Sequence, residues 1–123
     1  TFEKCCQVFL DGNKKPPTVA KLMRSRYSAF SLGGYGEYLF ATWHPAYRGQ
    51  LNAYELSIRS TDWISLKIIS SNQQGEKGEV EFIARFRNSD GTTSTHHEHS
   101  SFTREKGMWL YCDGLVEANE TED

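Results

Sequence analysis

Residues 22–30 are predicted to form an amphipathic helix that carries a charge inside its apolar stripe. At about 100° per residue, the apolar side chains of this region fall within roughly a third of the helix circumference. They are Val19, Leu22, Met23, Tyr27 and Phe30. Arg26 lies near the centre of the stripe and should face the interior. Because an unpaired charge in a core is very costly, Arg26 requires an inward-facing carboxylate from elsewhere in the chain.

The charged helix is expected to follow a separate N-terminal arm, residues 1–17. Pro16-Pro17 ends the arm, and Thr18 is a suitable N-cap for a helix that continues to about Leu32. Gly33-Gly34 then ends the helix. Two further short helices are predicted, at residues 35–43 and 51–59.

From Trp63 onward the apolar pattern changes to a period of two, which is typical of strands with one buried face. Loop signals at residues 73–76 and 88–91 divide this region into hairpins. The four predicted strands span residues 63–72, 80–87, 92–104 and 108–113. Helices followed by an antiparallel meander indicate an α+β fold.

Glu98 is predicted to supply the carboxylate that Arg26 requires. Strand alternation places Glu98 and Ser100 on the same face as Phe102, which marks the interior. We therefore expect an interior Arg26–Glu98 ion pair, with Ser100 or Tyr111 satisfying the remaining hydrogen bonds.

The opposite face of the third strand is expected to carry His97 and His99. Two histidines at i and i+2 could bind one metal ion. A polar outer face is the preferred interpretation, because no third ligand stands at a defined spacing from them. On the fourth strand, alternation predicts that Tyr111 and Asp113 share one side with Trp109.

The charge pattern gives no reason to expect a nucleic-acid partner. The formal net charge is -2, and part of the negative charge lies in an acidic tail, residues 117–123, which is expected to be solvated. No apolar run approaches the ~20 residues that cross a bilayer, and no signal-like segment is present. We expect no membrane partner and a cytoplasmic location.

Four motifs point to a known family. They are Leu-Met-Arg-Ser-Arg-Tyr-Ser-Ala-Phe at 22–30, Ala-Thr-Trp-His-Pro at 41–45, His-Glu-x-Ser-x-Phe at 97–102 and Trp-x-Tyr-x-Asp-Gly at 109–114. Together they resemble the YchJ-like family of uncharacterised proteins over nearly the whole chain. The resemblance implies a nuclear-transport-factor-2-like (NTF2-like) cone at residues 18–116, in which about three helices pack into the concave side of a curved antiparallel sheet of about four strands.

The same resemblance implies a SEC-C zinc motif at the N-terminus. Cys5-Cys6 is similar to the second half of that motif, whereas its first Cys-x-Cys half is absent from this chain. Structural zinc prefers four ligands. Cys5 and Cys6 are thus half a metal site; no cofactor is expected in this chain, and zinc only if upstream ligands are present.

The candidate site is the interior of the cone. The residues expected to line it are Arg26, Tyr27, Trp43, Trp63, Glu98, Ser100 and Tyr111. His44 or Asp113 could act as a general base, with a tyrosine such as Tyr27 stabilising an oxyanion, as other enzymes of this fold do.

These features favour a non-catalytic module that binds a small molecule or a protein over an enzyme. The alternative is a small acid/base enzyme of hydratase or isomerase type that uses the cone pocket. A homodimer formed through the sheet is a further expectation about partners. An open cavity in the cone would favour ligand binding or catalysis, and a filled one would exclude both.

Overall fold

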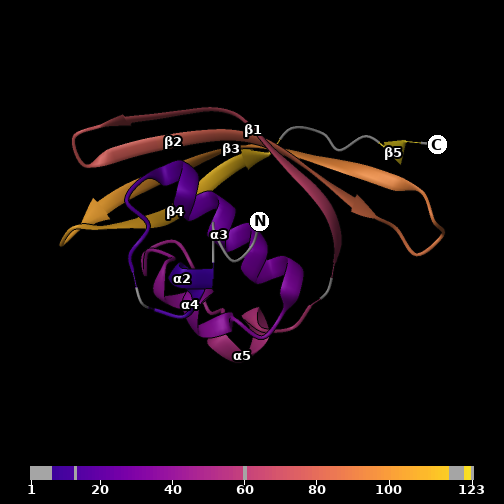
Figure 1. Ribbon diagram of the computed structural model, residues 1–123, viewed down its shortest axis with the longest axis horizontal. Helices are drawn as coiled ribbons and strands as arrows, with labels where there is room; N and C mark the ends of the chain where they lie inside the picture. The colour runs from indigo at the N-terminus through magenta and orange to yellow at the C-terminus, as the bar shows by residue number, and fades with distance from the viewer. Residues whose placement is uncertain (1–6, 13, 60, 117–120, 123) are drawn as a thin grey trace.

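The computed structural model describes residues 7–12, 14–59, 61–116 and 121–122. Its helices come first and its strands second, as predicted. The helices are α2 (Gln7–Leu10), α3 (Val19–Leu32), α4 (Gly36–Ala41) and α5 (Ala53–Leu56). The strands are β1 (Asp62–Gln74), β2 (Lys77–Arg87), β3 (Thr93–Glu105), β4 (Met108–Val116) and β5 (Thr121–Glu122). Figure 1 shows the helices gathered on one face of a curved sheet, so the α+β prediction is confirmed.

Helix α3 has the boundaries that its capping residues predict. The Thr18 hydroxyl accepts a hydrogen bond from the Lys21 amide at 3.2 Å, which satisfies one of the free amides at the helix start. At the other end, Gly33 has a φ of 75°, a conformation that favours glycine, and its amide donates to the Ala29 carbonyl.

The two short helices end earlier than the sequence predicts, and tertiary pairing explains the end of α4. After Ala41 the backbone pairs with β4: the Tyr111 amide donates to the Thr42 carbonyl, and the His44 amide donates to the Tyr111 carbonyl, both at 2.8 Å. Trp43 is thereby held beside Tyr111 in an isolated parallel bridge. Backbone groups that would have been hydrogen-bonded within a longer helix are therefore hydrogen-bonded to the sheet.

The sheet has the strand order β1-β2-β3-β4, with neighbouring strands antiparallel. The first hairpin is longer than predicted, because pairing continues to Gln74 and Lys77 and leaves only residues 75 and 76 in the turn. Strand β5 pairs with the start of β3. The rest of the predicted acidic tail lies outside the described residues.

A β-bulge in β4 reverses the alternation of side chains along that strand. Ser101 pairs with Asp113, whereas the next residue of β3, Phe102, pairs with Tyr111, so that Cys112 is an extra residue. Asp113 consequently lies on the outer face and Tyr111 on the inner one. The prediction that these two residues share a side is wrong, because alternation alone does not reveal a bulge.

The core consists of two apolar clusters. One lies between α3 and the inner face of the sheet, where Val19 and Leu22 pack with Phe82, Phe102 and Trp109. The other lies among the helices and is formed by Leu10, Ala29, Leu39 and Leu56. Because Leu10 belongs to α2, the residues predicted as an N-terminal arm contribute a buried side chain to the helical layer.

None of the helices in the described part of the chain is long and apolar enough to cross a membrane.

The close approach of α4 and α5 predicts the effect of a one-carbon substitution. A Cβ on Gly36 would overlap the Ala53 carbonyl oxygen and the Ser57 side chain. We expect Gly36→Ala to lower the free energy of unfolding by at least about 1–3 kcal/mol, the usual cost of overpacking. Urea denaturation followed by tryptophan fluorescence measures this. Glu37→Ala, at the exposed neighbouring position, should cost less than about 1 kcal/mol, and equal effects would contradict the packing argument.

Candidate functional site

A cavity of about 350 Å³ opens between α3 and the inner face of the sheet. Its walls are mainly aromatic and aliphatic: Met23, Tyr27, Phe30, Trp43, Trp63, Phe82, Ala84 and Phe86. Its polar lining residues are Arg26, Thr61, His96, Glu98 and Tyr111. The cone is therefore open rather than filled, and its volume lies within the usual range for small-molecule sites.

Arg26 is buried in a cage of aromatic rings. Its side chain is 2% exposed, and its guanidinium carbon lies 4.8 Å from the ring centre of Tyr111, 5.2 Å from that of Trp43 and 5.8 Å from that of Phe30. Such cation–π contacts strengthen when water is excluded. Burial lowers the pKa of Arg26 to about 10, which leaves the group charged at neutral pH.

The prediction of a direct Arg26–Glu98 ion pair is wrong. The Arg26 Nη1 donates to the Leu39 carbonyl at 2.9 Å and to Thr42 Oγ1 at 2.7 Å instead. Tyr111 connects the two charges: its ring lies over the guanidinium, and its hydroxyl donates to Glu98 at 2.9 Å. The carboxylate is still on the interior face, where it stabilises the cation through space rather than by a direct bond.

Glu98 is the centre of a hydrogen-bond network at the cavity. Its Oε2 accepts from the Ser100 hydroxyl at 2.5 Å and from Tyr111, and its Oε1 lies 2.9 Å from His96 Nε2. Burial by itself raises the pKa of Glu98, but the bonds to His96, Ser100 and Tyr111 together outweigh burial and hold this pKa below its ordinary value. Glu98 is thus an ionised, well-partnered carboxylate.

Tyr111 stays protonated in this setting. Burial, and then the neighbouring Glu98 carboxylate, raise the pKa of the Tyr111 hydroxyl well above its ordinary value. Tyr111 is therefore a fixed hydrogen-bond donor to Glu98.

Gly114 makes room for the Glu98 carboxylate. It pairs with Ser100 across the two strands, and a Cβ at this position would overlap Glu98. Gly114 of the Asp-Gly dipeptide thus has a steric role. The bulge makes this role possible, because it places Gly114 on the inner face.

Ser100 supports the site without lining the cavity. It is 1% exposed, and its hydroxyl donates to Glu98. The lining of the cavity does not include Ser100, whereas it includes the other six residues expected there.

The two predicted general bases lie outside the cavity. His44 Nε2 contacts Glu105 at 2.6 Å near the surface, and Asp113 is exposed on the outer face because of the bulge. Tyr27, the third candidate, does line the cavity, where its ring makes an edge contact with Trp63 at 6.0 Å between ring centres. Burial raises the pKa of Tyr27.

His96 is the functional candidate that sequence reasoning missed. It lines the cavity, its side chain is 25% exposed, and it contacts Glu98. The signal was present, because residue 96 has the same parity along β3 as Glu98 and Phe102.

The outer face of β3 carries His97 and His99, as alternation predicts. There the structure adds Glu81 of β2, with its Oε2 2.7 Å from His97 Nε2 and 3.5 Å from His99 Nε2. The sequence could not indicate this third residue, because its proximity depends on strand register. Cys5 and Cys6, the predicted half of a zinc site, lie outside the described residues.

The layout of the molecule, with helices packed into the concave side of a curved antiparallel sheet around an open cavity, is that of an NTF2-like domain. A sequence model of the family described as "YchJ, middle NTF2-like domain" matches residues 18–114. The chain belongs to this YchJ-like family, as its motifs indicated.

Similar proteins agree with this assignment. The chain is 40% identical over 116 residues to a UPF0225 protein of Chromobacterium violaceum, which covers 91% of this chain and 84% of that protein. It is 37% identical over 118 residues to a UPF0225 protein of Serratia proteamaculans, with 92% and 76% covered. The solution structure of a SEC-C motif containing protein from Rhodopseudomonas palustris superposes with a TM-score of 0.85 at 32% identity, covering 96% of this chain and 93% of that one.

The lowered pKa of Glu98 predicts a pH-dependent effect on stability. Because the folded-state pKa lies below the ordinary value of 4.5, ionised Glu98 contributes stability that is present above pH 4.5 and is lost as the pH falls through the lowered pKa. We expect Glu98→Gln to cost about 1–3 kcal/mol near neutral pH and progressively less in acid. Urea unfolding between about pH 7 and about pH 3 measures the difference.

Glu79→Gln is the matched control, because it changes an exposed carboxylate on the outer face. Its pH profile should follow that of the parent protein. A Glu98→Gln deficit that stays constant or grows in acid would contradict the assigned network.

Proposed function

We propose that the cone pocket binds a small, uncharged and largely apolar molecule that carries one hydrogen-bonding group. The open cavity of about 350 Å³ with aromatic walls and a polar cluster is the observation that supports this function. Ligand pockets commonly combine such walls with a few polar groups that fix orientation.

The aromatic wall is held in place before any ligand arrives. Trp63 makes edge contacts with Phe86 at 5.4 Å and with Tyr27 at 6.0 Å between ring centres, and Trp43 makes one with Tyr111 at 5.4 Å. Rings fixed in this way offer flat apolar surface at little cost in side-chain entropy. A planar ligand with one or two rings fits such walls.

The charges of the pocket favour a neutral ligand. Arg26 bonds to backbone and side-chain oxygens, and Glu98 has three hydrogen-bond partners. A charged ligand group would have to break one of these arrangements. A hydroxyl or carbonyl group can instead interact at the edge of the network, beside His96 and Tyr111.

Filling the cavity tests this proposal. Trp43 and Trp63 line the pocket, so quenching of tryptophan fluorescence by 2-naphthol reports binding. We expect saturable quenching, and at least about tenfold weaker binding in Ala84→Met, because the longer side chain occupies the space of the ligand.

The control carries the same substitution at an exposed position, Ala46→Met, and should bind like the parent protein. Thermal unfolding verifies that both variants fold. Non-saturable quenching, or equal affinity in both variants, would refute the pocket as the binding site.

Acid/base catalysis in the same pocket is the second candidate, and the His96–Glu98 contact supports it. A carboxylate that orients an imidazole at a substrate cavity is a common arrangement for a general base. His96 would replace His44 and Asp113 in the role that sequence reasoning gave them. The reaction class would be proton transfer at carbon, as in an isomerase or a hydratase.

Isotope exchange distinguishes catalysis from binding alone. The protein is incubated with 2-indanone, a neutral bicyclic ketone, in D₂O, and loss of the proton signal next to the carbonyl is followed by NMR. If His96 is a general base, His96→Asn should slow the protein-dependent exchange by about 10²–10⁴-fold, whereas His44→Asn should not. Saturable binding without accelerated exchange would leave the binding module as the function.

A further inference from the structure

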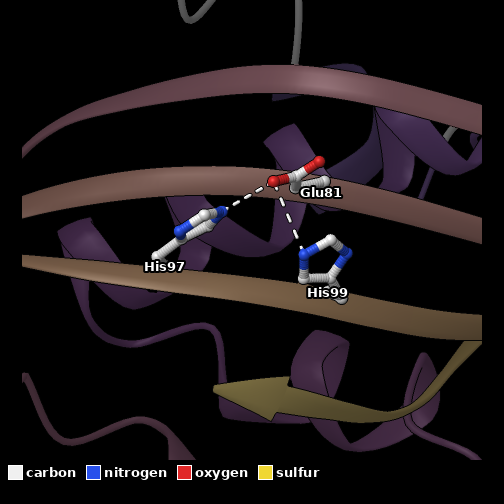
Figure 2. Close-up of side chains that lie close together, drawn as sticks. All are labelled: Glu81, His97 and His99. Atoms are coloured by element: carbon white, nitrogen blue, oxygen red, sulfur yellow. Dashed lines mark hydrogen bonds and ion pairs between the residues drawn. The ribbon is translucent and has the colours of Figure 1, made fainter. Parts of the chain in front are cut away.

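The outer face of the sheet, away from the helices, holds a cluster of three potential metal ligands. Figure 2 shows Glu81 on β2 pointing toward His97 and His99 on β3. One oxygen of Glu81 lies 2.7 Å from His97 Nε2 and 3.5 Å from His99 Nε2, and ligand atoms of all three residues lie within 4.8 Å of one another. The two imidazole rings are stacked, with their centres 5.6 Å apart.

The register of β2 and β3 brings these three residues together. Glu81 is the direct cross-strand partner of His99, and His97 is paired with Ile83 two residues farther along β2. Residues 97 and 99 share a face because strand side chains alternate with a period of two. The cluster is thus set by the central β2–β3 ladder rather than by a loop.

We propose that Glu81, His97 and His99 form a three-ligand site for a divalent transition-metal cation, with zinc as the best fit. Two imidazoles and one carboxylate are ligands that zinc accepts, and three protein ligands plus water are a common zinc coordination set. This site is separate from the cysteine motif and from the cone pocket.

The spacing of Glu81 from each of the two histidines is close to what zinc requires. Zinc lies about 2.0–2.2 Å from imidazole nitrogens and carboxylate oxygens, which places neighbouring ligand atoms of a tetrahedral site roughly 3.4 Å apart. The Glu81–His99 separation is 3.5 Å already, and the Glu81–His97 separation of 2.7 Å needs only a small side-chain rotation to widen. Binding replaces the hydrogen bond to His97 with two metal–ligand bonds.

The surroundings of the cluster favour a cation and leave it accessible. A polar groove of about 430 Å³ on the outer face is lined by Glu81 and His99, and also by Glu79 and Asp113. Two additional carboxylates lower the local potential, which attracts cations. The His99 side chain is 51% exposed, so water can complete the coordination from the groove side.

Zinc titration of the full chain tests the proposal. Cys5→Ser/Cys6→Ser serves as the parent protein, which removes the adjacent thiols as competing ligands. Isothermal titration with zinc chloride should give one site per chain, and the imidazole NMR signals of His97 and His99 should shift together. His99→Ala and Glu81→Gln should each weaken binding by at least about tenfold.

His44→Ala is the matched control, because it removes a histidine that contacts a different carboxylate, Glu105. This variant should bind zinc like the parent protein. Thermal unfolding without metal verifies that each variant folds, and Glu81→Gln keeps the shape of the side chain should His99→Ala disturb the strand. Absence of saturable binding, or unchanged affinity in both His99→Ala and Glu81→Gln, would overturn the site.

Discussion

The buried guanidinium of Arg26 is the constraint on which the arrangement of helices and sheet depends. A cation that is 2% exposed must recover its lost hydration from the protein. Here it does so from three aromatic rings, a carbonyl near the end of α4 and the hydroxyl of Thr42. These groups come from α3, α4, the segment after α4 and β4. One side chain therefore fixes the relative positions of four parts of the chain and shapes one wall of the cavity.

The negative counterpart, Glu98, organises the polar side of the same cavity. It is held on β3 by hydrogen bonds from residues of both β3 and β4, and Gly114 leaves the space that it occupies. Tyr111 links the two charges, because it contacts Arg26 with its ring and Glu98 with its hydroxyl. A pocket built in this way keeps two charges inside a largely apolar cone while giving each of them partners.

The sequence predicted those features that depend on local pattern. The boundaries of α3 follow from Thr18 and Gly33, and the period of two predicted the faces of β3. The sequence did not predict the partners of Arg26, because no sequence pattern marks which carbonyl oxygens and ring faces will contact a given side chain. It also missed the bulge that turns Asp113 outward and the approach of Glu81 to the two histidines, since both depend on how strands align in space.

Residues 96–99 of β3 alternate between the cavity and the outer surface, and this alternation limits how the segment can change in sequence. Within four consecutive positions, His96 and Glu98 serve the cavity, whereas His97 and His99 lie on the outer surface. A single substitution here alters one surface only. Insertion or deletion of one codon upstream within the strand would exchange the two faces. Glu98 and His96 would then leave the cone, and His97 and His99 would enter it. A change in the length of this stretch should therefore be more disruptive than a substitution at any one of its positions.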